Sequence, residues 1–251
     1  MDIKTLSESF QAETITKPIF YRGLMNHPTW SLAGERTASG QLQLGVLRPQ
    51  GGGKILEIFS GPDATQAFEQ AHGEPVAQPQ MHLVGHELFG MLSDGLVDRL
   101  NIDPGSPHTF HFLRNQLGLL RRWAQTVALE CSLQDPNAVP NPLGLLASFE
   151  HYHLVVLPGQ GEQYSLVLAP DSRGRSLGAI FTSEDAAVEF GQAIAKELGR
   201  SPEVREVAAR PLFERLKAMT LQGLVFNPLT DLPPRALSAA IIDPILQRAP
   251  R

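Results

Sequence analysis

Several side chains are of types that do chemistry, and their spacing decides what each group is able to do. His82 and His86 stand four residues apart with Glu87 beside the second, a spacing that would suit two metal ligands on one helix face. The order is not His-Glu-x-x-His, and we expect a helix to start near Gly85, which would place His82 on the preceding strand. The two imidazoles would then not share a face, and the sequence predicts no metal site.

Two further candidates have simpler structural interpretations. His151 and His153 flank Tyr152 on an expected strand, so both would point to one face. No acidic or cysteine partner follows at ligand spacing, and we expect polar residues that face solvent or are hydrogen-bonded. Cys131 ends an apolar stripe and is expected to be a small buried hydrophobe, not a nucleophile.

The glycine-rich segments do not match nucleotide-binding loops. The glycines at 51–53 and Lys54 lack the phosphate-loop spacing and lead into a strand, and Gly159–Gln160–Gly161 lacks the dinucleotide pattern. We therefore predict no catalytic residue and no cofactor. An active site can also be assembled from scattered residues, so an unrecognised hydrolase stays as a third functional alternative, after the two given below.

One hydroxyl–carboxylate pair occurs twice. Ser60 precedes Asp63 by three residues, and Thr182 precedes Asp185 in the same way. A hydroxyl at a helix start accepts from backbone N–H groups, and an acid in the first turn complements the helix dipole. This pattern favours two helix caps over a catalytic Ser–Asp pair.

The repeated pair belongs to an internal duplication. The segments 58–70 and 180–192 have nearly the same sequence, 122 residues apart. At that offset 12 of the 53 positions 18–70 are identical without a gap, several times the roughly 6% that average composition gives by chance. Past residue 70 the match continues at an offset of 124 residues. The chain is therefore predicted to contain two copies of one domain.

The hydrophobic pattern predicts the fold class α/β (α+β). Each copy is expected to form a mixed sheet, with an antiparallel β-meander followed by alternating helices and strands (βββαβαβα-like). The first copy, 1–134, would end in a long amphipathic helix at about 108–131, capped by Ser106. A linker of turn-forming residues at about 132–142 would lead to the second copy, 135–251.

Composition excludes some function classes. The 251 residues are 42% hydrophobic and 19% charged, with a net charge of −5, so no basic face is expected to bind nucleic acid. No apolar run of 18 residues predicts a membrane span. The first ten residues are mixed polar without an apolar stretch, so we expect no secretory signal and a cytoplasmic location, with which the single cysteine is compatible.

Together these elements resemble the SseB N-terminal-domain family. The resemblance rests on the Phe-x-Arg-x-Leu start at 20–24, the strand end and helix start at 180–186, and the closing Gly-Leu-Val-Phe-Asn-Pro at 223–228. It covers roughly 18–120 and 142–248, in two tandem copies, of which the first is the more divergent.

The resemblance implies an α/β bacterial protein without catalytic residues to transfer. The family is named for an association with enhanced serine sensitivity, and its name is shared with a type III secretion protein. We therefore expect a non-catalytic accessory or regulatory module that binds another protein, associated with secretion or stress. The alternative is a small-molecule binder linked to amino-acid metabolism.

The expected interaction surface lies on the long helix. Arg121, Arg122 and Trp123 fall off its apolar stripe, and Arg and Trp are favoured at interface hot spots. The partner would be another protein or a second copy of the chain. A groove between the two copies is the alternative site, for a small molecule.

Overall fold

The structure is a computed structural model that describes residues 2–39, 41–50, 52–77, 79–92, 95–135, 141–159, 164–170, 174–219, 221–228 and 236–249. The chain divides into two compact units, Met1–Val127 and Ala128–Arg251. None of the helices in the described ranges combines the length and apolar character that a membrane span requires.

The N-terminal unit opens with two helices, α1 (Ile3–Gln11) and α2 (Lys17–Met25). The sequence interpretation missed α1, although Asp2 caps it by accepting from the Thr5 N–H at 2.7 Å. Phe10 stacks on Phe20 with ring centroids 4.1 Å apart, so α1 packs against α2.

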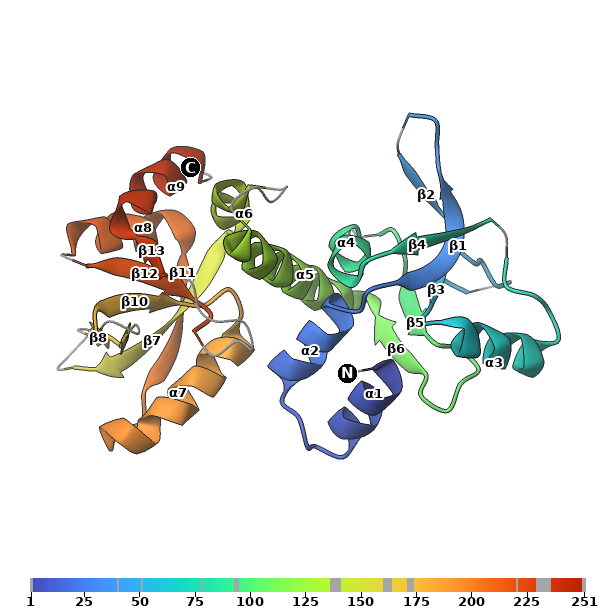
Figure 1. Cartoon of the computed structure of the whole chain (residues 1–251), viewed down its shortest axis with the longest axis horizontal. Helices are drawn as coiled ribbons and strands as arrows, with labels where there is room; N and C mark the ends of the chain where they lie inside the picture. Colours follow the sequence, from blue (N-terminus) through green and yellow to red (C-terminus); the bar gives the residue numbers. More distant parts are fainter. Residues whose placement is uncertain are drawn as a thin grey trace. The chain divides into compact units, whose positions relative to one another are not determined.

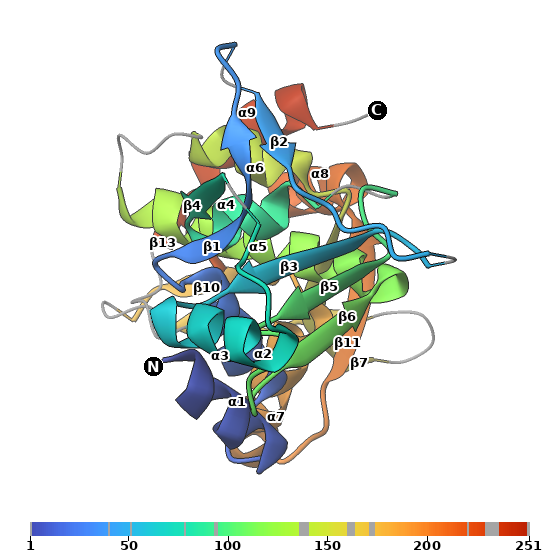
Figure 2. The same ribbon diagram turned by 90° about the vertical axis from the view of Figure 1, so that its right-hand side faces the viewer.

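The sheet of this unit combines antiparallel and parallel pairs. Its described strands are β1 (Trp30–Arg36), β2 (Leu42–Leu44), β3 (Ile55–Phe59), β4 (Gln80–Leu83), β5 (Arg99–Ile102) and β6 (Phe110–Leu113). They lie in the order β2-β1-β3-β5-β6, with β4 paired to β1. The pair β3–β5 is parallel and β5–β6 is antiparallel, and the three strands lie side by side in Figure 2.

Two helices connect these strands. α3 (Pro62–His72) follows β3 and ends at Gly73, whose left-handed backbone (φ 71°) suits glycine. α4 (Gly85–Gly90) begins against the end of α2: the Gly85 N–H donates to the His27 carbonyl at 3.0 Å, and a Cβ at Gly85 would lie 2.4 Å from the Leu24 carbonyl oxygen. This close approach requires glycine and fixes the turn that carries His27.

The expected helix at 108–131 is displaced. Residues Phe110–Leu113 form β6, and the helix α5 runs over Arg114–Gln134. Ser106 holds a turn, since its hydroxyl accepts from the His108 N–H at 3.2 Å, and Gln116 Oε1 accepts from the Leu113 N–H at the true helix start. The alternation of Phe110 and Phe112 suits a strand, and pairing with β5 outweighs the helical spacing.

The division between the units lies inside α5, before the expected boundary at 134. Leu129 and Leu133 belong to the hydrophobic core of the second unit, which explains why the helix is shared. Of the expected linker 132–142, residues 132–134 are helical, and 136–140 lie outside the described residues.

The C-terminal unit also combines helices with strands. Its described elements are α6 (Pro142–Ser148), β7 (His151–Pro158), β8 (Tyr164–Leu166), β9 (Leu168–Pro170), β10 (Ser176–Ile180), α7 (Glu184–Leu198), β11 (Glu203–Ala208), α8 (Ala209–Ala218), β12 (Gly223–Phe226), β13 (Ala236–Ser238), a 3-10 turn η1 (Ala239–Ile241) and α9 (Ile242–Arg248). The strands form two sheets, β13-β12-β10-β9 and β11-β7-β8. In Figure 1, α8 and α9 lie on one side of these strands and α7 on the other.

The register of the parallel pair agrees between the units. Ile58 lies opposite Ile102 in β3–β5, and Ile180 lies opposite Phe226 in β10–β12. Ile58 corresponds to Ile180 at the sequence offset of 122 residues, and Ile102 corresponds to Phe226 at the offset of 124 residues. The α/β class with mixed sheets is confirmed, and the agreement of register supports the duplication, which stays a prediction.

Candidate functional site

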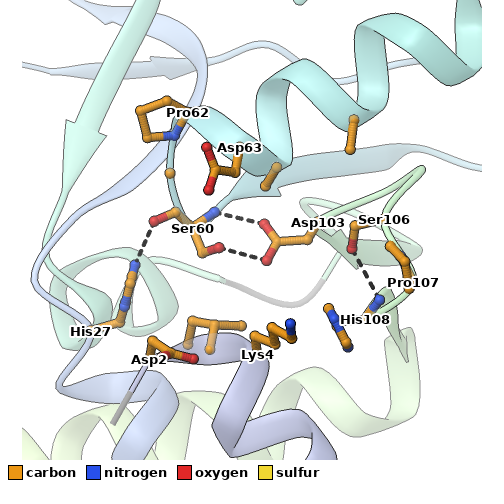
Figure 3. A pocket seen from close by; sticks show the side chains of 14 residues that line it. Asp2, Lys4, His27, Ser60, Pro62, Asp63, Asp103, Ser106, Pro107 and His108 are labelled. Atoms are coloured by element: carbon orange, nitrogen blue, oxygen red, sulfur yellow. Dashed lines mark hydrogen bonds between the residues drawn. The ribbon is translucent and has the colours of Figure 1, made fainter.

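The N-terminal unit contains a pocket of about 530 Å³ at the carboxyl ends of β3 and β5. Its lining residues are Asp2, Ile3, Lys4, His27, Ser60, Gly61, Pro62, Asp63, Ala64, Ala67, Asp103, Ser106, Pro107 and His108. Figure 3 shows Ser60 and Asp103 in the middle, with Pro62 and Asp63 on one side and Asp2, Lys4 and His108 on the other. A ligand would therefore meet both acidic and basic groups.

Asp103 is the buried centre of this pocket. Its Oδ1 accepts from the Ser60 N–H at 2.6 Å, and its Oδ2 accepts from the Ser60 hydroxyl at 2.6 Å. The Asp103 N–H donates to the Ile58 carbonyl at 2.9 Å, and its backbone has a positive φ of 49°, which Asp tolerates better than most residues. The side chain thus ties the end of β5 to the end of β3.

Burial raises the pKa of Asp103 above its ordinary value of 3.8. The two hydrogen bonds from Ser60 and the charges of His27 and His108 oppose this rise, because each favours the ionised carboxylate. The effect of burial is the larger one, so the charged form of Asp103 is costly in the folded protein. A group that donates a hydrogen bond or carries positive charge in the pocket would reduce that cost.

Two imidazoles and one ammonium group also line the pocket. His27 Nε2 lies 2.9 Å from the main-chain oxygen of Ser60, so it donates there in the tautomer that carries the Nε2 proton. His108 Nε2 lies 3.9 Å from the carboxylate of Glu8 on α1. Lys4, also on α1, is exposed at the edge of the pocket.

The structure corrects the expected helix caps. The N-cap of α3 is Gly61, without a side-chain hydrogen bond, and the N-cap of α7 is Ser183, whose hydroxyl accepts from the Ala186 N–H at 3.3 Å. Ser60 and Thr182 each stand one residue earlier. Their side chains instead bond Asp103 and Asn227, which follow β5 and β12, the parallel neighbours of the strands before them.

The C-terminal unit has a related but closed arrangement. Asn227 Oδ1 accepts from the Thr182 N–H at 3.0 Å, and its Nδ2 donates to Thr182 Oγ1 at 2.9 Å and to Glu130 Oε1 at 2.8 Å. All three side chains are buried. Glu130 therefore lies on Asn227, whereas Asp103 faces a pocket.

The pocket offers binding groups of both signs but not the relay of a serine hydrolase. The Ser60 hydroxyl donates directly to Asp103, while His27 bonds the main-chain oxygen of Ser60 and not its hydroxyl. In a Ser-His-Asp triad an imidazole lies between the hydroxyl and the carboxylate, and Ser60, His27 and Asp103 do not have that order. Among the described residues, no group of three or more His, Cys, Asp and Glu is placed to hold a metal ion.

The histidine and cysteine candidates are scattered. His82 lies on β4 with Nδ1 2.9 Å from Ser31 Oγ, and His86 lies in the first turn of α4. His151 is exposed and His153 is buried. Cys131 is exposed, so the expectation that it is a buried hydrophobe is wrong; the buried residues in this part of α5 are Leu129, Glu130, Ser132 and Leu133.

The glycine-rich candidates serve the fold where they are described. Lys54 Nζ donates to the Gly95 carbonyl at 3.0 Å, and its N–H donates to Asp98 Oδ2 at 2.8 Å. Residue 51 of the first segment and residues 160 and 161 of the second lie outside the described residues. Lys54 thus stabilises the loop that contains Gly95 and Asp98.

The expected interaction surface is only partly at the surface. Trp123 is fully buried and stacks on Tyr21 with centroids 5.6 Å apart, and the Arg22 guanidinium lies 5.2 Å from its ring centre. The expectation that Trp123 is exposed is therefore wrong: it lies three residues after Leu120 and four before Val127, so it shares their buried face of α5 and packs onto α2. Arg122 is exposed and Arg121 is half-buried.

Sequence reasoning did not bring Lys4, His27, Asp103 and His108 together. One signal was available: Asp103-Pro104 aligns with Asn227-Pro228, the segment that carries the family resemblance. By itself, Asp or Asn before Pro favours a turn and does not indicate a site. The hydrogen bond across to Ser60 needed the register of β3 and β5.

Comparisons with known proteins give one family match. Residues 11–118 match the model of the SseB protein N-terminal domain. Among curated proteins none matches the chain. Among solved structures, Anabaena Tic22 (protein transport) is similar at 12% identity and a TM-score of 0.23, over 82% of this chain and 88% of that chain; a score this low does not establish a shared fold. Residues 11–118, which carry Ser60, Asp103, His27 and His108, belong to the SseB N-terminal-domain family.

Proposed function

We propose that the chain is a non-catalytic accessory protein whose N-terminal unit binds a small zwitterion of the amino-acid class in the Ser60–Asp103 pocket. The observation that carries the proposal is a half-enclosed pocket in which a buried carboxylate faces basic side chains from another element. Pockets of some 300–1,000 Å³ with a few convergent polar groups are typical small-molecule sites.

Charge complementarity supports a zwitterion over a simple anion or cation. Asp63 and Asp103 would receive an ammonium group, and Lys4 on the far wall would receive a carboxylate. The ammonium would reduce the cost of keeping Asp103 ionised in its buried place. Apolar lining from Ile3 and Ala67 leaves room for a short side chain.

The non-catalytic part of the proposal rests on the hydrogen bonds of Ser60. Its hydroxyl is held by Asp103, and its main-chain oxygen accepts from His27 in the tautomer described above. These contacts position the turn before α3, which is a structural task. The Asn227 amide bonds the N–H and the hydroxyl of Thr182 at the related position in the C-terminal unit, so these contacts do not require a carboxylate there.

The test is a thermal-shift and calorimetric screen of the full chain with the twenty amino acids, serine included. A ligand at a hundred times its Kd should stabilise the protein by about 2.7 kcal/mol and raise Tm by about 5 °C or more. Lys4→Met should weaken binding at least tenfold. Lys17→Met, which removes an exposed lysine that does not line the pocket, is the matched control and should bind as wild type does.

Two outcomes would contradict the proposal. One is a screen in which no amino acid moves Tm. The other is a ligand whose affinity is the same in wild type, Lys4→Met and Asp103→Asn, since such a ligand binds elsewhere.

A second function, binding of another protein in an accessory role around secretion or stress, is supported by the exposed face of α5. Asn115, Leu119 and Arg122 follow one another at spacings of four and three, and all three are exposed. An apolar residue beside an arginine suits an interface with an acidic partner or with a second copy of the chain.

Sedimentation of the purified chain tests self-association at this face. Leu119→Asp should abolish a dimer, while Leu198→Asp, which changes an exposed leucine of α7, should leave it intact. A monomer at all concentrations, or a dimer that survives Leu119→Asp, would remove self-association as the function of this face.

A further inference from the structure

The N-terminal unit has a second hollow of about 480 Å³ that shares no lining residue with the Ser60–Asp103 pocket. It arises because β1 pairs with β3 only at Ser31 and Leu32 and then continues alongside β2. The chain returns to β3 through the bridge between Leu47 and Ile55. The gap between the diverging strands is lined by one end of α3 and by residues 74–77.

Most of the wall is apolar. Phe59, Phe68, Val76 and Leu47 contribute the large side chains. Phe68 meets Phe59 edge-on at 5.4 Å, so the wall contains aromatic surface from a strand and from a helix. Such a hollow would hold an aliphatic or aromatic body.

The polar part of the wall is acidic. Glu57 is half-buried on β3 and Glu74 is exposed. The imidazole of His72 stacks on Phe68 at 4.3 Å with its Nδ1 3.0 Å from the Phe68 carbonyl. Among the described lining residues none is lysine or arginine.

Glu57 is held in position by its neighbours on the sheet. Asn101 lies opposite Glu57 in the β3–β5 pair, and His111 lies opposite Asn101 in the β5–β6 pair. His111 Nδ1 is 3.0 Å from Asn101 Oδ1, which leaves the amide Nδ2 to donate to Glu57. Burial raises the pKa of Glu57, and the Asn101 hydrogen bond and the charges of His72 and Arg99 oppose the rise.

We propose that this hollow is a binding site for a small organic cation with an apolar body, such as an arylalkylammonium. The ammonium group would lie at Glu57, with Glu74 adding negative charge at the edge. The body would pack on Phe68, Val76 and Leu47, where an aromatic face also attracts a cation. The site is independent of the amino-acid pocket, and its test does not depend on that proposal.

The probe is 2-phenylethylammonium, titrated into the full chain by calorimetry. Its matched analogue is 3-phenylpropionate, which keeps the ring and reverses the charge. We expect the cation to bind and the anion not to bind. Glu57→Gln should weaken the cation at least tenfold, and Glu35→Gln, an exposed glutamate of β1 outside the hollow, should change its affinity less than twofold.

A second readout reports on the carboxylate itself. Glu57 should titrate at lower pH when the cation is bound, since a nearby positive charge favours the ionised form. The carboxyl ¹³C shift of Glu57 against pH, with and without the probe, measures this.

The proposal is overturned if the native chain does not bind 2-phenylethylammonium at up to about 10 mM, or if 3-phenylpropionate binds equally well. It is also overturned if Glu57→Gln leaves the affinity for 2-phenylethylammonium unchanged. A comparison with Nα-acetyl-lysine methylamide separates a free amine from a lysine side chain of another protein. Tighter binding of that compound than of 2-phenylethylammonium would assign the hollow to a partner's lysine and overturn the small-molecule proposal.

Discussion

Asp103 and Asn227 do the same structural task with opposite hydrogen-bond chemistry. Each has a left-handed backbone, with φ of 49° and 46°, and each accepts the N–H of a strand-end hydroxyl residue through Oδ1. With its second atom, Asp103 accepts from the Ser60 hydroxyl, whereas Asn227 donates to the Thr182 hydroxyl. The fold therefore needs a short side chain with a carbonyl oxygen at this position. An amide meets that need at Asn227, so the negative charge of Asp103 is not required for these contacts.

Asp103→Asn is predicted to preserve the fold. The new amide would accept from the Ser60 N–H and donate to its hydroxyl, as Asn227 does with Thr182. The free energy of unfolding should stay within about 0.5 kcal/mol of wild type or rise. Asp103→Ala removes both hydrogen bonds and places alanine at positive φ, so it should cost about 2–4 kcal/mol. Urea unfolding of the three proteins measures the difference; equal losses in both variants would show that the charge itself is required.

The pH dependence of stability should carry the signature of Asp103. Its folded pKa lies above the ordinary 3.8, so the folded state binds the proton more tightly than the unfolded state. The contribution of Asp103 to the free energy of unfolding is therefore fully present below pH 3.8, where the carboxyl is protonated. It is lost as the pH rises through the folded pKa. The difference in unfolding free energy between wild type and Asp103→Asn should therefore shift against wild type as pH rises from about 3 to 7. Unfolding curves of both proteins across that range test this, and a difference that is constant with pH would contradict it.

The fold could be predicted from the sequence where periodicity and turn chemistry agree. The strands that contain Ile58 and Ile180, the helices after them and the α/β class all follow from local patterns. The boundaries around Phe110 could not be predicted, because its helical spacing competes with pairing to β5, which is a tertiary effect. The burial of Trp123 follows instead from its place on the buried face of α5, three residues after Leu120 and four before Val127.

The site was less predictable than the fold. Ser60 and Asp103 are 43 residues apart and are joined by hydrogen bonds across a parallel strand pair. Lys4 comes from a helix that sequence reasoning missed. Local spacing identifies caps and strands, but it does not show which strand ends are neighbours.

Asn227→Asp is predicted to destabilise the C-terminal unit at neutral pH. Asn227 Nδ2 donates to Glu130 at 2.8 Å, and both side chains are buried. A carboxylate in its place would face the carboxylate of Glu130, and an uncompensated buried charge costs about 3–5 kcal/mol. Chemical unfolding at pH 7 should show a loss in that range.

Two controls identify repulsion as the cause. Lowering the pH should restore much of the lost stability, because two close carboxylates can share a proton. The second change Glu130→Gln should rescue the fold at pH 7, since its amide can donate to the new carboxylate. If the double variant is as unstable as Asn227→Asp alone, the loss comes from another contact of Asn227.

Trp123→Ala is predicted to behave as a core mutation and not as the loss of an interface residue. Trp123 is fully buried, stacks on Tyr21 and lies beneath the Arg22 guanidinium, so its removal leaves a cavity between α5 and α2. Replacement of a buried tryptophan by alanine costs about 3–5 kcal/mol. The neighbouring Arg122 is exposed, and Arg122→Ala should change the free energy of unfolding by less than about 0.5 kcal/mol. Urea unfolding of both variants separates the two roles: a small loss for Trp123→Ala would mean that the ring is available to a partner, because the fold would not then depend on it.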